Sequence, residues 1–327
     1  MAKKINKKTG FAVFIILFAV VLAVMFVSLF LGSVMISPAE LFKSEILWQI
    51  RLPRVSLAAL LGLMLAISGV ILQGILRNPL ADPYVLGISA GGAIGAAVAL
   101  AAGAQVVILG MSSVPVMAFV TSLAAVFIVY KLAQVAGKTS PETLILAGVA
   151  LSAFCAAILS LIIILTGNLQ SIYFWLLGSL SSATWSNVLT VIPYAVFGSA
   201  VAYFFSKELN ALLLGEEMAQ TLGVDVERIR LFLIGTASLM TAAAVSVSGL
   251  IGFVGLIIPH FIRLLVGPNH RYLIPISALS GMLLMVAADT IARTVLSPTE
   301  IPIGIIMSLV GAPFFLYLLR RRRVEGK

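Results

Sequence analysis

Long apolar segments follow one another along the chain with only short polar connections. The stretch from Leu144 to Ser206 contains no Asp, Glu, Lys or Arg, and neither does the stretch from Leu231 to Ile262. Soluble domains carry roughly 25% charged residues, whereas this chain of 327 residues carries 10% and is 61% hydrophobic. One core cannot hide so much apolar surface, so its surroundings must also be apolar. The sequence therefore predicts an integral membrane protein.

Ten segments have the composition of membrane-spanning helices. About 20 apolar residues cross a bilayer as a helix, which satisfies its own backbone hydrogen bonds. We expect an all-α bundle with spans at residues 11–32, 55–76, 85–104, 114–136, 144–166, 185–206, 229–249, 255–267, 273–294 and 303–320. The eighth is too short for a simple crossing, and we expect a half-helix broken by Gly252, Gly255 and Pro259. The first is too long for a signal-peptide core and no A-x-A site follows it, so we expect it to be retained.

The basic residues predict the topology. With the N-terminus inside and ten crossings, only Lys43, Arg51, Arg54 and Arg293 of the 21 Lys and Arg residues fall outside. An excess of Lys and Arg on the cytoplasmic side is the usual orientation signal. Both termini are therefore expected in the cytoplasm.

One charged segment interrupts the apolar pattern, from Lys207 to Arg230, and the topology places it in the cytoplasm. Gly215 and Gly223 are expected to end short helices there. Met218, Leu222 and Val226 follow at i, i+4 and i+8, which predicts one apolar ridge. Such a helix can cap the bundle, lie in the lipid interface or fit a groove on a partner. Its acidic polar face disfavours the lipid interface, and the residues alone leave capping and docking open.

Small residues recur in the apolar segments, for example in "GISAGGAIGAAVALAAGA" (Gly87 to Ala104). Small faces allow helix backbones to approach closely in lipid. The stretches "ISGVILQGILRNP" (Ile67 to Pro79) and "VSGLIGFVGLIIP" (Val247 to Pro259) share a spacing of Ser, Gly and Pro. This likeness is the basis for predicting two inverted five-helix halves.

No catalytic or metal-binding set stands out. The tripeptide Gly-Lys-Thr in "AGKTSPE" (Ala136 to Glu142) ends like a phosphate-binding loop, but Leu132 occupies the place of the required first glycine. A single Cys and two His residues make neither a disulfide framework nor a metal cage. We therefore expect no ATPase site, no metal and no cofactor on this chain.

Arg51, Arg54 and Arg293 supply most of the positive charge on the outer side. They could anchor helix ends at the interface, or form a basic collar that meets an acidic partner. Asp289 lies four residues before Arg293, so one helical face can pair them. Glu300 is expected to act as a structural cap.

Three long motifs cover nearly the whole chain from Arg51 on. They are "RLPRVSLAALLGLMLAISGVILQGILRNPLADPYVLGISAGGAIGA" (Arg51 to Ala96), "GFVGLIIPHFIRLLVGPNHRYLIPISALSGMLLMVAADTIAR" (Gly252 to Arg293) and "EIPIGIIMSLVGAPFFLYLL" (Glu300 to Leu319). In these motifs the chain resembles FecCD-type permeases, the membrane subunits of ABC importers for iron–siderophore, haem and cobalamin. The resemblance implies one permease domain over residues 1–327 in the bacterial cytoplasmic membrane, paired with a second permease. It also implies cytoplasmic ATPase subunits, which use the ATP, and an extracytoplasmic binding protein.

The resemblance also implies roles for particular residues. "LGEEMAQTLGV" (Leu214 to Val224) is similar to the family's ATPase-docking loop, which favours docking as the role of the charged segment. The implied coupling residues are Gly215, Glu216, Glu217, Met218, Leu222 and Gly223. Arg51, Arg54 and Arg293 match arginines that face the binding protein. The segment Thr139 to Thr143 matches a cytoplasmic gate through Thr139, Ser140, Pro141 and Glu142, although Pro141 and Glu142 depart from the small polar residues expected. The fifth span implies path residues Ser152, Ser160 and Thr166.

The sparse charge of the expected path suits a large, carrier-shielded cargo, because bare Fe³⁺ would require carboxylate ligands. We expect a ferric siderophore, with haem and cobalamin as open alternatives, and the choice between a homodimer and a heterodimer is also open. An ATP-independent transporter would need an ionisable residue at mid-membrane, which the spans hardly offer. An intramembrane enzyme would need a catalytic pair, whereas His260 is most simply a helix-end residue.

Overall fold

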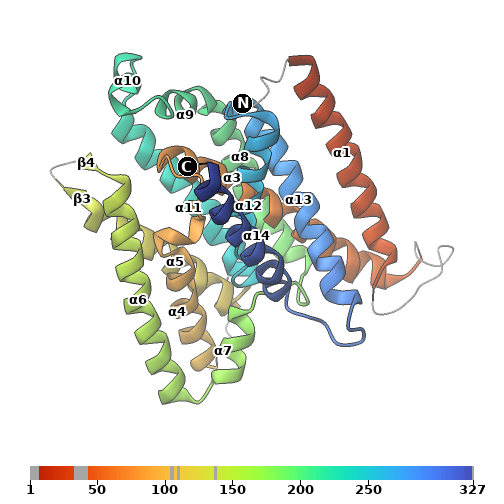
Figure 1. The fold of residues 1–327 in the computed structure, drawn as a ribbon. Coiled ribbons are helices and arrows are strands. Elements are labelled where there is room, and N and C mark those ends of the chain that lie inside the picture. Colours follow the sequence, from red (N-terminus) through yellow and green to blue (C-terminus); the bar gives the residue numbers. More distant parts are fainter. Residues whose placement is uncertain (1–6, 33–42, 104–106, 109–110, 136–137, 326–327) are drawn as a thin grey trace.

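The computed structural model describes residues 7–32, 43–103, 107–108, 111–135 and 138–325, and these residues are almost entirely helical (Figure 1). The helices are α1 (Lys7–Phe30), the π-helix η1 (Leu47–Arg51), α3 (Leu52–Ile75), the 3-10 helix η2 (Pro83–Leu86), α4 (Ile88–Ala101), α5 (Ser113–Ala133), α6 (Pro141–Thr166), α7 (Leu169–Leu176), α8 (Trp185–Phe204), α9 (Ser206–Leu212), α10 (Glu216–Thr221), α11 (Val226–Ser248), α12 (Val254–Val266), α13 (His270–Thr294) and α14 (Ile303–Glu325). Two antiparallel strand pairs of two residues each join β1 (Val107–Ile108) to β2 (Met111–Ser112) and β3 (Gln134–Val135) to β4 (Lys138–Thr139).

Every predicted span corresponds to a helix. Within the described residues, seven helical segments are long and apolar enough to cross a membrane, and α4, α12 and the apolar part of α14 are shorter. The ten crossings, the inverted halves and the cytoplasmic termini stay predictions, and Lys3, Lys4 and Lys327 of the basic flanks lie outside the described residues. The sequence did not predict α7, which follows α6 after a turn at Gly167.

Helix α3 is the centre of the bundle, and nearly all of its residues are buried. It packs against α13, α11, α12 and α8. A Cβ atom at Gly62 would lie 2.1 Å from the carbonyl oxygen of Gly281 in α13, and one at Gly69 would lie 1.9 Å from that of Gly255 in α12. Only glycine permits these backbone approaches, so the prediction of close packing through small residues is confirmed.

The break before α12 differs from the prediction. The chain leaves the helical path at Gly249 (φ 70°) and Phe253 (φ 69°), and α12 then continues through Pro259 without interruption. Gly255 and Pro259 therefore lie inside the short helix and do not break it. His260 lies in the middle of α12 and is buried, so its prediction as a helix-end residue was wrong.

The two ends of the bundle carry different elements. Figure 1 shows α9, α10 and the β3–β4 pair at the end opposite α7. In the same view α6 lies at one edge of the bundle and α1 at the other. The sequence-predicted sites thus separate into a group near α10, a group near the start of α3 and a group along α6.

Candidate functional site

The charged segment between α8 and α11 forms the two short helices that the sequence predicts. Gly215 (φ 110°) precedes α10 and Gly223 (φ 83°) follows it, and glycine adopts positive φ at little cost. Asp225 caps α11 by accepting a hydrogen bond from the backbone N–H of Arg228 at 3.2 Å. A small buried cluster beneath the two helices consists of Ala211, Leu212, Ala219 and Val226.

The predicted apolar ridge is divided between the core and the surface. Val226 is only 2% exposed, whereas Met218 and Leu222 are 53% and 61% exposed. The prediction of one continuous ridge was wrong because α10 ends at Thr221 and Gly223 redirects the chain before Val226. Met218 and Leu222 are left as an outward apolar surface, beside the exposed Glu217.

Glu216 turns inward from the same helix. Its carboxylate accepts a hydrogen bond from Nη2 of the buried Arg230, and it lies 3.4 Å from Nη2 of Arg77, just beyond the end of α3. Of the two acidic residues at the start of α10, therefore, Glu217 is presented to the exterior and Glu216 is bound within the chain.

The predicted gate segment lies directly beside the charged segment. A cavity of about 720 Å³ is lined by Ser140, Pro141 and Glu142 together with Gly215, Glu216, Glu217 and Met218. The Thr139 hydroxyl donates a hydrogen bond to Oε2 of Glu227 at 3.1 Å. Ser140 caps α6 by accepting from the N–H of Thr143 at 3.2 Å. Two groups that are about 75 residues apart in the sequence thus form one site. Of the Gly-Lys-Thr tripeptide, Lys138 and Thr139 lie in β4 and Gly137 lies outside the described residues.

The three predicted outer arginines lie together at the other end, but they are buried. Arg51, Arg54 and Arg293 are 4%, 6% and 3% exposed. Arg54 Nε lies 3.0 Å from Asp289 Oδ1, and its Nη1 lies 2.9 Å from Glu300 Oε1. The Asp289–Arg293 pair that the sequence predicts is present at 3.6 Å.

These arginines also join helices. Arg51 Nη1 donates to the carbonyl oxygen of Leu29 at 2.6 Å, and Arg293 Nη2 donates to that of Ser28 at 2.7 Å, so both reach the end of α1. Glu300 supplies one of the two carboxylates that pair with Arg54, and its expected role as a cap stays a prediction. Docking of a binding protein by these arginines stays a prediction. Within this chain all three are buried; Arg54 and Arg293 pair with carboxylates, and Arg51 donates to backbone carbonyl oxygens.

The predicted path residues lie along α6, and two of them are at its surface. Ser160 is exposed and donates its hydroxyl back to the carbonyl of Ala156 at 2.9 Å, Thr166 does the same to Ile162 at 2.7 Å, and Ser152 is half-buried. The surface of α6 otherwise presents large apolar side chains, including those of Leu146, Phe154, Leu161 and Ile164. Helix α6 is therefore an apolar face of the single chain.

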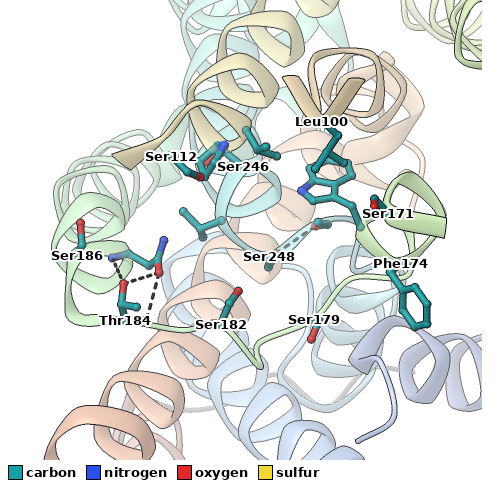
Figure 2. Close-up of a pocket in the computed structure, with 16 residues that line it drawn as sticks. Leu100, Ser112, Ser171, Phe174, Ser179, Ser182, Thr184, Ser186, Ser246 and Ser248 are labelled. Atoms are coloured by element: carbon teal, nitrogen blue, oxygen red, sulfur yellow. Dashed lines mark hydrogen bonds between the residues drawn. The ribbon is translucent and has the colours of Figure 1, made fainter. Parts of the chain in front are cut away.

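A cavity rich in hydroxyl groups lies elsewhere, and the sequence analysis missed it. It has a volume of about 460 Å³ and lies between α7 and the adjoining ends of α4, α5, α8 and α11 (Figure 2). Its polar lining residues are Ser112, Ser171, Trp175, Ser179, Ser182, Thr184, Ser186, Asn187, Ser246 and Ser248. No Asp, Glu, Lys, Arg or His is among the described residues that line it.

Several of these groups are free to bind a ligand. The hydroxyls of Ser112, Ser171, Ser182 and Ser186 and the indole N–H of Trp175 have no hydrogen-bond partner among the described residues. Thr184 and Asn187, in contrast, are joined in a capping box at the start of α8, and Figure 2 shows the hydrogen bonds at Thr184 as dashed lines. The sequence signal was the concentration of serine in "SLSSATWSN" (Ser179 to Asn187) and "SVSG" (Ser246 to Gly249).

Such a cavity offers neutral hydrogen-bond donors and acceptors beside the aromatic rings of Phe174 and Trp175. Among the described residues, no group of three or more His, Cys, Asp or Glu side chains is placed to hold a metal ion. The chemistry that this arrangement supports is hydrogen bonding to an uncharged or internally neutralised, oxygen-rich molecule.

Comparisons with known proteins agree on one family. The model of the FecCD transport family matches residues 19–321. The cobalamin import system permease protein BtuC of Halobacterium salinarum is 49% identical over 278 residues, which cover 85% of this chain and 74% of that protein. The hemin transport system permease protein HmuU of Yersinia pestis is 41% identical over 283 residues, covering 84% and 83% of the two chains.

Two further matches extend over almost the full length. The Fe(3+)-citrate import system permease protein YfmE of Bacillus subtilis is 38% identical over 333 residues and covers 98% of both chains. A structure solved in an inward-facing conformation, of a metal-chelate type ABC transporter, superposes with a TM-score of 0.85 at 33% identity, covering 95% of this chain and 99% of that one.

Proposed function

The chain belongs to the FecCD transport family, and we propose that it is the permease subunit of an importer that moves a bulky metal chelate across the cytoplasmic membrane. A separate ATPase supplies the energy through α10, and an extracytoplasmic binding protein delivers the cargo. The observation that carries the proposal is the family match over residues 19–321, which includes all of the site residues described above.

The inner end of the molecule supports a coupling role for α10. Met218 and Leu222 expose apolar surface beside the acidic Glu217, a combination that suits the groove of a protein partner. Residues of this helix also line one cavity with the segment that begins α6. A partner that closes on ATP can change the permease only if it contacts α10 differently in its two states. The outward surface of α10 is where such differential contacts would form.

The cargo class follows from the hydroxyl-lined cavity. Serine hydroxyls and an indole N–H can bind the amide, hydroxamate or carboxyl oxygens of a chelate. They are poor ligands for bare Fe³⁺, which favours carboxylates and other anionic oxygen donors. We therefore assign to this cavity a contact with a cargo whose metal is already enclosed.

Three cargoes within this class have support from named relatives. A ferric siderophore, which the sequence led us to expect, is supported by the relatives named for import of Fe(3+)-citrate and iron(3+)-hydroxamate, which are 34–38% identical. Cobalamin is supported by the 49% identity to a permease named for cobalamin import. By the same measure, cobalamin is the first compound to test, and haem is the second because a permease named for hemin transport is 41% identical.

The test is cargo uptake by cells that lack only this subunit, complemented with the gene or with variants of it. Radiolabelled cobalamin, ferric hydroxamate, ferric citrate and haem are supplied separately. We expect uptake of one of them to be lost and then restored by complementation. Unchanged uptake of all four, with the subunit shown to be present in the complemented cells, would refute the proposed cargo class.

Substitution of one exposed residue tests the dependence on a partner ATPase. Met218→Asp should abolish both uptake and co-purification of the ATPase, because a carboxylate would be buried in the interface. Met218→Leu keeps the volume and apolar character and serves as the matched control. Since Met218 is 53% exposed, both variants should reach the membrane at normal levels. Co-purification that survives Met218→Asp would contradict docking through α10.

A further inference from the structure

Arg230 is a buried arginine at the junction between the charged segment and the gate segment. It lies one turn into α11, is 1% exposed and is among the largest fully buried side chains of the described residues. Its Nη1 lies 2.7 Å from Oε1 of Glu227 and also donates to the carbonyl oxygen of Thr139, while its Nη2 pairs with Glu216. The sequence offered no role for it beyond a contribution to topology.

These contacts connect three separate parts of the chain. Glu216 begins α10, Glu227 belongs to the first turn of α11, and Thr139 ends β4 immediately before α6. Glu227 completes the connection with its second oxygen, which accepts from the Thr139 hydroxyl at 3.1 Å. The guanidinium is a planar, rigid fork, so its partners are held in a fixed relative orientation.

Helix α10 has few other constraints. It is six residues long and lies between Gly215 and Gly223, both at positive φ. A Cβ atom at Gly223 would meet nothing within 4 Å, and one at Gly215 would meet only Nη1 of Arg77 at 4.0 Å. Helix α10 contributes only one of its described residues, Ala219, to the apolar cluster beneath it. Besides its packing on α9 and α11, helix α10 is held through the ion pairs of Glu216 with Arg230 and Arg77.

We propose that Arg230 is a positioning residue that couples α10 to the start of α6, so that displacement of α10 moves the Thr139–Thr143 segment. This inference rests on the proposed function and identifies the residue through which the coupling passes. A purely stabilising arginine on α11 would need only Glu227, three residues before it on the same helix. Nε of Arg230 has no partner among the described residues, and a buried donor left unsatisfied is costly. The side chain therefore leaves one buried donor unpaired while its two other nitrogens reach Glu216 on α10 and Thr139 on β4.

The test uses the complete importer, with permease, ATPase and binding protein, reconstituted in vesicles. Cargo uptake and ATP hydrolysis are measured on the same preparation. For Arg230→Met we expect normal association with the ATPase and continued ATP hydrolysis, but at least about a tenfold fall in cargo moved per ATP. Arg230→Lys keeps the charge and loses the fork, so it should give an intermediate ratio.

The matched control is Arg228→Met. Arg228 lies two residues away on α11 and its side chain is 89% exposed. Its one ion pair within the described part of the chain is with Asp225 at 2.9 Å. Uptake per ATP should stay at the wild-type value in this variant. Glu216→Gln is a second, milder variant, because it keeps the size of the side chain and removes only its charge. If Arg230→Met fails to assemble, the cargo moved per ATP by Glu216→Gln is the deciding measurement: a fall supports the inference, and a wild-type value contradicts it.

A distance measurement reports the connection directly. Spin labels at Gln220 and Glu142 occupy the exposed surfaces of α10 and the start of α6. In the otherwise wild-type importer the distance between them should have a narrow distribution in each nucleotide state, and Glu216→Gln or Arg230→Met should broaden it. The inference is overturned if the wild-type importer works and both variants still show normal cargo uptake per ATP and a narrow distance distribution. Failure of the wild-type chain to import cargo with an ATPase would instead overturn the proposed function.

Discussion

The clusters of arginine and carboxylate at the two ends of α3 use the same chemistry to hold different structures. Near the start of α3, Arg54 lies between Asp289 and Glu300; beyond its end, Arg230 lies between Glu216 and Glu227. Helix α3 has 24 residues, so about 36 Å separates its ends. Both arginines are buried and both touch two carboxylates.

The difference lies in what each arginine joins. The cluster around Arg54, called the outer cluster after the predicted topology, links α1, α3 and α13, which are long helices packed against one another. The cluster around Arg230 is called the inner cluster on the same basis. The inner cluster links a six-residue helix between two glycines to the start of α6. Loss of the outer contacts should therefore reduce stability, whereas loss of the inner contacts should mainly disturb the geometry of coupling. A buried ion pair acts as a clamp between rigid helices and as a linkage where one partner can move.

The largest effect should follow Asp289→Ala in the outer cluster. Asp289 is 1% exposed, and its removal leaves Arg54 and Arg293 with less negative charge around them. Removing one member of a buried ion pair typically costs about 3–5 kcal/mol. We expect a low yield of folded protein and a much lower melting temperature in detergent.

Asp225→Ala provides the comparison for that measurement. Asp225 pairs with the exposed Arg228 and caps α11, so its loss should cost about 1 kcal/mol. Equal melting temperatures for Asp289→Ala and Asp225→Ala would show that the outer cluster is not a clamp.

An intermediate effect, on transport more than on stability, should follow Gly223→Ala at the inner end. Gly223 has φ 83°, and its added Cβ would meet no atom within 4 Å. The cost to folding is then only backbone strain of about 1–2 kcal/mol. Because the strain changes the angle at which α10 leaves α11, cargo uptake should fall several-fold.

Gly167→Ala is a close control, since Gly167 has φ 67° and open space around its Cβ position but lies at the end of α6 near α7. It should carry the same strain with normal uptake. If the two variants lose uptake equally, backbone strain alone would explain the loss, and the position of Gly223 beside α10 would play no part.

The sequence predicted the helices well because apolar length is a local property. All ten apolar segments are helical, and Gly215 and Gly223 bound α10 as expected. Val226 was predicted to lie on the same apolar ridge as Met218 and Leu222. Gly223, at positive φ, interrupts the helix between them, so the spacing of these residues no longer predicts which way their side chains face. Pro259 was misread because the helix it occupies continues through it.

The contacts between sites were beyond the sequence for a different reason. Arg54 meets Asp289 across 235 residues, and Arg230 meets Thr139 across 91. Periodicity cannot predict pairs at that separation, because they depend on which helices pack together. The same holds for the hydroxyl-lined cavity, whose serines come from α7, α8 and α11, from β2 and from the connection between α7 and α8.

The smallest effect should come from Glu300→Gln, and it bears on whether the outer cluster also meets a partner. Glu300 is the most exposed member of the cluster, with 33% of its side chain accessible, and it neutralises part of the charge of Arg54. If an acidic binding protein docks here, removal of this negative charge should strengthen capture at low salt by up to about fivefold, the range of a partly exposed ion pair. The gain should disappear at high salt, where the screening length is short. If the arginines serve only to hold α1, α3 and α13, capture should be unchanged at every salt concentration, while the melting temperature should still fall slightly. The outer arginines would then be structural alone, and the contrast between a clamp at one end of α3 and a linkage at the other would be complete.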